Sequence, residues 1–153
     1  MAERCTGSET GCVKYINWIN DCNAYLRDKD EKHSIANYEK YYRSILDQAK
    51  AQNPDILFVL GETFALPYTT IEANQTPMCR DVIARQNVVK RLVTEYDAIL
   101  VPYQHVFNKA LSKAPEKYWI WDNIHPTYAG HKLMTREWLK QVSKRIKFLK
   151  KYS

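Results

Sequence analysis

The residues of this sequence best suited to chemistry are an aspartate and a histidine three positions apart, Asp122 and His125, in the segment DNIHP. A carboxylate that accepts a hydrogen bond from one ring nitrogen of a histidine holds the imidazole in one tautomer, so that the other nitrogen can take a proton. Asp-x-x-His on a tight turn allows this contact and predicts a general base. The local alternative is a turn in which Asp122 bonds to its own backbone and His125 packs nearby.

Two further polar pairs directly follow apolar runs of the sequence. Asn20-Asp21 follows the run 13–19, and Glu62-Thr63 follows the run 55–60. The amide of an asparagine at a strand end can donate to an oxyanion, although asparagine and aspartate also cap helices and form turns. Ligands of open parallel sheets bind at the carboxyl ends of the strands, so we expect both pairs to lie near Asp122 and His125.

The elements that must position these residues follow from the hydrophobic pattern. Three short apolar runs, 13–19, 55–60 and 98–102, predict strands buried on both faces. Helices are expected between and after them: 35–49 after the cap Ser34, a helix opened by Thr76-Pro77, a short one over 103–113, and one from Thr127 to Ile146. Strands that alternate with helices predict an α/β fold with a parallel sheet of about three strands.

Length and composition limit the class of protein. The 153 residues are about the size of one domain, and 45% hydrophobic residues exclude a disordered chain. No apolar run is long enough for a membrane-spanning helix, and the segment 1–11 has no apolar stretch of a signal peptide. We therefore expect residues 1–12 to be a short extension, residues 13–153 to form the domain, and the protein to be cytoplasmic without a membrane partner.

The cysteines and histidines show no metal-binding spacing. No two of the four cysteines have the C-x-x-C spacing of a zinc or redox site, and no histidine falls near them in a metal pattern. We expect no metal, no cofactor and reduced thiols. The cysteines are Cys5, Cys12, Cys22 and Cys79.

The net charge of +6 raises the possibility of a nucleic-acid partner. Much of the excess lies near the end of the last predicted helix, where cations complement the helix dipole. We favour a solvated helix end over a binding patch and expect no nucleic-acid partner. The basic residues concerned are Lys140, Lys144, Arg145, Lys147, Lys150 and Lys151.

Three separated segments keep the order and spacing of the blocks of one known family. They are 15–25 (YINWINDCNAY), 37–68 (from NYEKYY to FALPY) and 101–139 (from VPYQ to the helix after DNIHP). Together they resemble the SGNH hydrolases, also called GDSL-type esterases. The first occupies the place of the family's G-x-N-D block, the second is similar to the helix, strand and F-x-L-P segment of one bacterial branch, and the third resembles the D-x-x-H-P block.

The resemblance implies a role for each matching residue. His125 would be the base that takes the proton of the nucleophile, Asp122 would orient and stabilise the imidazolium, and Asn20 would donate to the oxyanion. It implies an incomplete flavodoxin-like (SGNH-type) α/β/α sandwich. The activity implied is ester hydrolysis through an acyl-enzyme, without a cofactor, on a small-molecule or carbohydrate ester.

The sequence departs from the family pattern in its first part. The nucleophilic serine and an oxyanion-hole glycine of the family should lie tens of residues before Asn20, which only 19 residues precede. Ser8 is the nearest match to that serine but follows no predicted strand, and Trp18 stands where the G-x-N-D block has its glycine. We therefore expect the chain to be inactive by itself; the alternative is a non-catalytic remnant or binding module.

The absent first strand has a structural consequence. In the family's strand order it would lie beside the predicted strand 13–19, which is therefore expected to form an open, apolar sheet edge. Open edges of this kind pair with other chains. We expect self-association through 13–19, or marginal stability.

Overall fold

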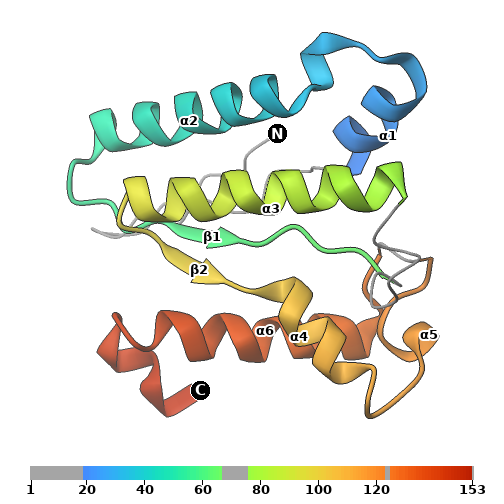
Figure 1. Cartoon of the computed structure of the whole chain (residues 1–153). Coiled ribbons are helices and arrows are strands. Elements are labelled where there is room, and N and C mark those ends of the chain that lie inside the picture. Colours follow the sequence, from blue (N-terminus) through green and yellow to red (C-terminus); the bar gives the residue numbers. More distant parts are fainter. Residues whose placement is uncertain (1–18, 67–75, 123–124, 153) are drawn as a thin grey trace.

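The computed structural model describes residues 19–66, 76–122 and 125–152, coloured along the chain in Figure 1. In chain order they form α1 (Ile19–Asp28), the 3-10 turn η1 (Glu31–His33), α2 (Ile35–Gln52), β1 (Val59–Gly61), α3 (Pro77–Glu95), β2 (Ile99–Val101), α4 (Tyr103–Ala110), α5 (Glu116–Trp119), α6 (Tyr128–Val142) and the 3-10 helix η3 (Lys147–Tyr152). The α/β fold class is confirmed, as an incomplete α/β arrangement.

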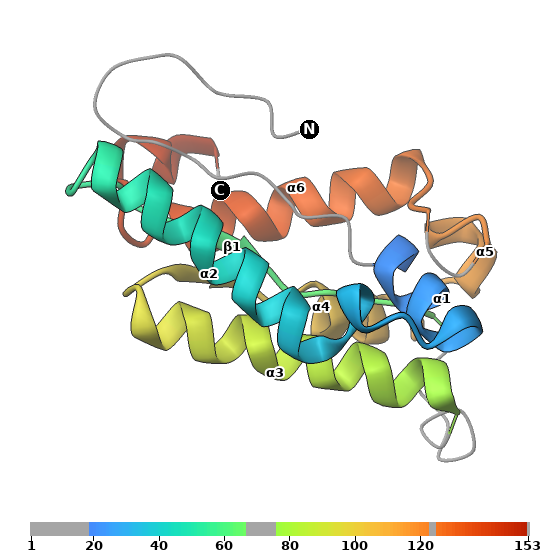
Figure 2. The same cartoon turned by 90° about the horizontal axis from the view of Figure 1, so that it is seen from above.

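A small parallel sheet separates two layers of helices. β1 and β2 pair in parallel, from Val59 opposite Ile99 to Gly61 opposite Val101. Figures 1 and 2 show α2 and α3 on one face of the sheet and α4 and α6 on the other. Both strands point toward the end of the molecule where α1 and α5 lie, so that end carries the carboxyl edge at which ligands of open α/β sheets bind.

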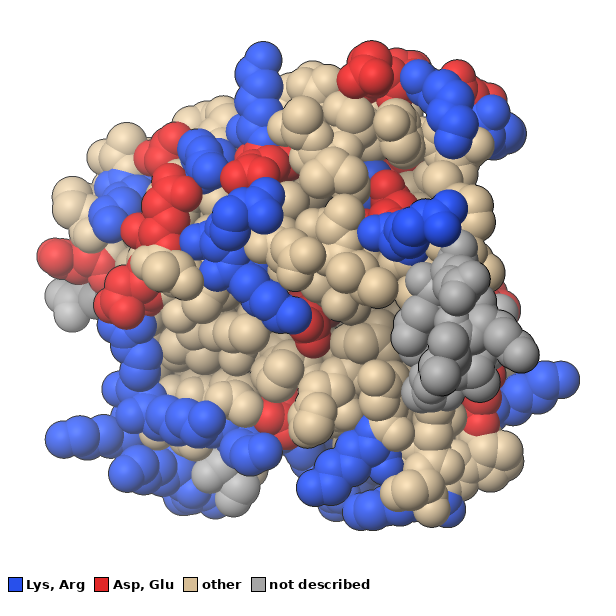
Figure 3. All heavy atoms as spheres, viewed as in Figure 1, with Lys and Arg blue, Asp and Glu red and all other residues tan. Residues whose placement is uncertain are grey.

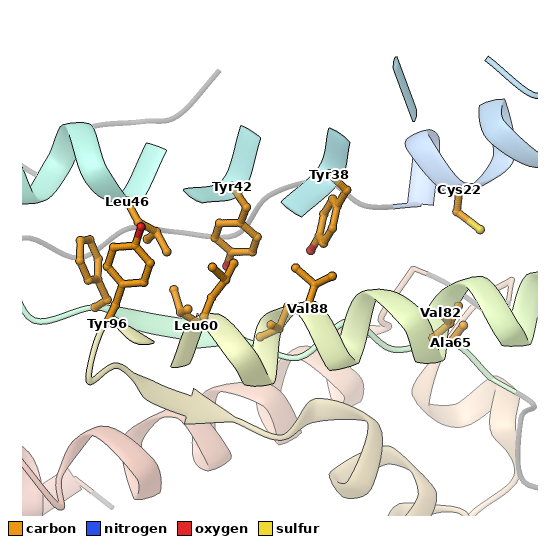
Figure 4. Close-up of a cluster of buried hydrophobic side chains, with 12 residues drawn as sticks. Cys22, Tyr38, Tyr42, Leu46, Leu60, Ala65, Val82, Val88 and Tyr96 are labelled. Atoms are coloured by element: carbon orange, nitrogen blue, oxygen red, sulfur yellow. The ribbon is translucent and has the colours of Figure 1, made fainter. Parts of the chain in front are cut away.

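Alternation along the two strands divides the buried side chains into two cores. Phe58 and Leu60 pack against α2 and α3, in the cluster drawn in Figure 4. Val59, Ile99 and Val101 point the other way, into a cluster with Phe107 of α4 and Val142 of α6. Successive residues of a strand face opposite sides, so this short sheet joins both helical layers into one unit.

The expected helix starts at Ser34, Thr76 and Thr127 are confirmed. Each of these side-chain oxygens accepts a hydrogen bond from the backbone N–H three residues later, at Asn37, Cys79 and Gly130 respectively. Such N-caps each stabilise a helix by about 1 kcal/mol. The last cap matters for function because it fixes the chain directly after His125.

The predicted strand 13–19 is wrong at its end, because Ile19 begins α1. Cys22 is fully buried and Leu26, four residues later, packs against the same core, which is the spacing of a helical face. Residues 13–18 lie outside the described residues, as do the expected extension 1–12 and most of the proposed self-association edge. Within the part of the chain that the structure describes, the sheet has two strands rather than three.

The C-terminal part differs in detail from the expected single helix. α6 ends at Val142, before the expected end at Ile146, and a turn leads into η3. Arg145 lies in this turn and donates to the backbone oxygen of Asp97 at 2.6 Å and to its carboxylate at 2.8 Å. Figure 3 shows Lys and Arg side chains gathered over this end of the molecule. None of the described helices is both long and apolar enough to cross a membrane.

Candidate active site

Asp122 and His125 form the hydrogen-bonded pair that their spacing predicts. His125 Nδ1 lies 2.8 Å from Asp122 Oδ2 and 3.0 Å from Oδ1, and the backbone N–H of His125 donates to Oδ1 at 2.9 Å. Asp122 therefore closes the turn and also orients the ring, so the local and the chemical interpretation of this motif both apply. With Nδ1 assigned as the donor to the carboxylate, Nε2 carries the lone pair of a base.

The pair is open to the surroundings. The side chain of His125 is 71% exposed and that of Asp122 is 58% exposed. We call Asp122–His125 the outer pair. An exposed imidazole whose Nε2 points away from its carboxylate can reach a reacting group, provided that the backbone around it is held in place.

A short antiparallel bridge holds that backbone. Ile120 and Pro126 are bridge partners, and the N–H of Trp121 donates to the carbonyl of His125 at 2.8 Å. Ile120 is fully buried in the cluster on the α6 side of the sheet. The turn that carries the outer pair is thus anchored through Ile120 to the core.

The start of α6 is locked to the same segment by Thr127 and Gly130. Thr127 Oγ1 lies 2.7 Å from the carbonyl oxygen of Tyr118 and 3.2 Å from that of Trp119, and it accepts from the N–H of Gly130. A Cβ placed on Gly130 would lie 2.2 Å from the carbonyl oxygen of Trp119. Only glycine therefore allows α6 to begin this close to the segment before the outer pair.

Asn20, the third residue expected at the site, is the second residue of α1. Asn20-Asp21 was expected directly after the predicted strand 13–19, and in the described chain both residues are helical. α1 lies at the same end of the sheet as α5 in both ribbon views. The side chain of Asn20 lies outside the described atoms, and its approach to His125 stays a prediction.

Glu62 and Thr63 follow β1 as expected but take part in a structural network. The buried Glu62 carboxylate accepts from the backbone N–H of Gln104 at 3.3 Å and pairs with Lys90 at 3.2 Å. The Thr63 carbonyl accepts from the amide of Gln86 at 2.9 Å. These contacts tie the segment after β1 to α3 and α4, so we assign Glu62 to support of the fold.

A second aspartate–histidine pair was not identified from the sequence. Asp21 Oδ1 lies 2.8 Å from His33 Nδ1, and these side chains are 35% and 24% exposed. We call Asp21–His33 the inner pair. The two residues are twelve positions apart in different elements, so no sequence motif relates them. They line a cavity of about 310 Å³ together with Lys32, Tyr38, Tyr41, Tyr42 and Ile45.

A buried arginine, Arg85, donates a hydrogen bond to the backbone of the inner pair. Arg85 is fully buried; its Nε donates to Asp81 at 2.7 Å, and its Nη2 donates to the carbonyl of His33 at 2.9 Å. Its guanidinium lies 4.8 Å from the ring centre of Tyr38.

Burial, together with the nearby Asp81 carboxylate, raises the pKa of the Cys22 thiol far above its usual value. The i, i+4 spacing of Asp81 and Arg85 is the sequence signal that could have identified this ion pair.

The serines of the described residues are engaged locally. Ser34 accepts from Asn37 and Ser44 accepts from Gln48, while Ser112 and Ser143 donate to the carbonyls of Lys109 and Lys140. Ser8 lies outside the described residues. Over the ranges that the structure describes, no cluster of three His, Cys, Asp or Glu side chains could hold a metal ion, and Cys22 and Cys79 are buried cysteines.

Comparison with known proteins relates most of the described framework to one family. Residues 19–138 match the model of the GDSL-like lipase/acylhydrolase family. The chain is 29% identical over 113 residues to an acetylxylan esterase from Geobacillus stearothermophilus, a match that covers 73% of this chain and 49% of that enzyme. The chain thus spans about half the length of the curated relative that it matches.

Solved structures give the same relationship. A protein from Parabacteroides merdae proposed to be a GDSL-like lipase superposes with a TM-score of 0.72 at 26% identity, covering 88% of this chain and 60% of that one. The acetylxylan esterase from Geobacillus stearothermophilus superposes with a TM-score of 0.68 at 25% identity, covering 87% of this chain and 57% of that one. The match therefore extends over the fold as well as the sequence.

Proposed function

This chain belongs to the GDSL-like lipase/acylhydrolase family, and on that premise we propose that the outer pair is the base of an ester-hydrolysing site. The observation that carries the proposal is the contact of His125 Nδ1 with Asp122 at 2.8 Å, which leaves Nε2 of an exposed ring as the proton acceptor. An orienting carboxylate and a histidine base are two of the three parts of a hydrolytic triad.

The reaction would proceed through an acyl-enzyme. His125 Nε2 takes the proton of a serine hydroxyl while its oxygen attacks the ester carbonyl, and Asp122 stabilises the imidazolium. The proton then passes to the departing alcohol as the ester C–O bond breaks. In the second half, His125 takes a proton from water, the resulting hydroxide attacks the acyl-enzyme, and the carboxylic acid leaves as the serine regains its proton.

Asn20 is our proposed side-chain donor to the oxyanion of both tetrahedral intermediates. Its place in the first turn of α1 supports this role, because the free N–H groups and the dipole of a helix start also favour negative charge. The reaction needs no cofactor.

The substrate that we propose is an acetyl ester of a carbohydrate. The support for this class is the likeness to an acetylxylan esterase in both sequence and structure. A cytoplasmic location and the absence of nucleic-acid and membrane partners remain predictions from the sequence.

We further propose that these 153 residues do not complete the site by themselves. In the described part of the chain, each of the four serines has a local hydrogen-bond partner other than His125. This observation also favours the alternative function, a non-catalytic remnant or binding module that retains the fold and the outer pair without hydrolysis.

Hydrolysis of p-nitrophenyl acetate tests the proposal that these residues do not complete the site. The wild-type chain and His125→Ala should show the same slow background, and His131→Ala, which removes another exposed histidine, is the matched control. If the wild type is fast and only His125→Ala is slow, a nucleophile exists within these residues, and Ser8 and Ser34 are the first to replace.

A chimera tests the base itself. The N-terminal part of the Geobacillus stearothermophilus acetylxylan esterase, placed before residue 19, supplies the blocks that carry the family's serine. His125→Ala in this chimera should lower kcat about 10²- to 10⁴-fold. A folded, active chimera that is indifferent to His125→Ala would refute the assignment of the base.

A further inference from the structure

The most exposed tryptophan of the described chain stands beside the proposed base. Trp121 is 72% exposed, whereas Ile120, the residue before it, is fully buried. Successive residues of extended chain face opposite sides, so anchoring Ile120 in the core turns the indole of Trp121 outward. The backbone conformation at Ile120 and Trp121 therefore accounts for the exposure of the Trp121 side chain.

The register of the bridge predicts that the indole and the imidazole lie on one face. Ile120 is the partner of Pro126, and the N–H of Trp121 bonds to the carbonyl of His125. The next opposed residues are therefore Trp121 and His125. Residues directly opposite in an antiparallel pair have Cβ atoms about 4.5–5.5 Å apart on the same side, so we expect the aromatic plane of Trp121 to flank the base.

The described exposed side chains around this plane carry polar groups. Between residues 116 and 128, the described large hydrophobic side chains that are exposed are Tyr118, Trp121 and Tyr128, and each carries an O–H or N–H. The exposed carboxylate of Asp122 adjoins them. A large continuous apolar patch marks binding of a lipid or of a protein partner, whereas a sugar ring offers an apolar C–H face bordered by hydroxyl groups, which matches an aromatic plane with polar edges.

We propose that Trp121 is a substrate-binding residue that stacks against a pyranose ring of the carbohydrate ester and so holds the ester beside His125. This inference rests on the proposed function, of which it specifies the substrate contact. It assigns the saccharide, and not the acyl group, to the Trp121 side of the base.

Titration of the full chain with xylotetraose, followed by NMR of the indole N–H groups, tests the proposal. The chain contains four tryptophans, and Trp121→Phe assigns the signal of Trp121. That signal should shift on addition of the sugar. Trp121→Ala should weaken binding about fivefold to tenfold, which is the usual size of one aromatic contact, and Trp121→Phe should weaken it less.

Two controls separate this contact from other effects. Phe148→Ala removes an aromatic side chain of equal exposure, 71%, from η3, which lies far from α5, and should leave sugar binding unchanged. His131→Ala, which removes an exposed histidine outside the proposed site, should also bind xylotetraose normally. Because xylotetraose carries no ester, failure of the hydrolysis experiment and failure of this titration are independent results.

Three results would overturn the proposal. They are an unshifted Trp121 signal at saturating sugar, binding by a folded Trp121→Ala chain that equals binding by the wild type, and a change in sedimentation of Trp121→Ala when the wild type binds no sugar. The last would show that a second copy of the chain covers this side chain.

Discussion

The molecule contains two aspartate–histidine pairs with the same contact distance and different settings. In both, a carboxylate oxygen lies 2.8 Å from Nδ1. The outer pair lies within one turn, and its histidine is 71% exposed; the inner pair joins α1 to η1, and its histidine is 24% exposed. The distance alone therefore does not reveal a catalytic base.

What differs is the structure behind each pair. The inner pair adjoins Arg85, which is buried together with its partner Asp81. Arg85 also donates to the carbonyl of His33. The polar groups of the inner pair and of Arg85 therefore take part in the packing of α1, η1 and α3. The outer pair projects from an anchored turn, and both of its side chains are more than half exposed. We therefore expect the inner pair to support stability and the outer pair to support chemistry.

The largest expected effect concerns the buried charge beneath the inner pair. Asp81→Asn leaves the Arg85 guanidinium without its counter-ion, and removal of one partner of a buried ion pair costs about 3–5 kcal/mol. Urea unfolding followed by circular dichroism measures this loss. Asp97→Asn, which breaks the exposed pair with Arg145, should change the free energy of unfolding by at most about 0.5 kcal/mol. Equal losses in the two variants would contradict the distinction.

The next largest effect on stability concerns the close contact between α6 and the segment before the outer pair. Gly130→Ala introduces a Cβ against the carbonyl oxygen of Trp119, so α6 must shift away from the segment before Asp122. Overpacking of this kind costs about 1–3 kcal/mol. Thermal melting measures the loss, and Ala129→Gly, which changes a neighbouring helical residue without adding atoms, serves as the control for backbone propensity. A Gly130→Ala chain as stable as the wild type would show that α6 can begin elsewhere.

The smallest expected changes in the free energy of unfolding are those caused by replacing the two histidines. His33→Ala removes a half-buried hydrogen bond between α1 and η1 and should destabilise the chain by about 1 kcal/mol. His125→Ala removes an exposed side chain and should stay within about 0.5 kcal/mol of the wild type. Paired denaturation curves measure both. If His125→Ala is the more damaging change, the outer pair is a structural contact and our assignment of the base loses its support.

Much of the framework was predictable because its signals are local. The caps Ser34, Thr76 and Thr127 specify helix starts through one side-chain oxygen each, and the short apolar runs around 55–60 and 98–102 identify both described strands. The outer pair belongs to this class, since a spacing of three residues on a turn brings Asp122 to His125 without help from the rest of the chain.

The sequence failed where a local pattern admits two structures. The apolar run before Asn20 was interpreted as a strand that includes Ile19, yet α1 begins there because Cys22 and Leu26 bury one helical face against the core. Tertiary packing decided between strand and helix, since a short apolar run satisfies either period.

The sequence by itself determined the family, the order α2-β1-α3-β2-α4-α6 and the outer pair, because these depend on motifs and on neighbours along the chain. Only the tertiary structure decided the inner pair, the burial of Arg85 and the outward position of Trp121. Each of these depends on which distant residues a side chain meets: Asp21 meets His33 only when α1 packs beside η1, and Trp121 faces outward only because Ile120 is held in the core formed with α6. Such contacts are set by the packing of whole elements, and no spacing in the chain encodes them.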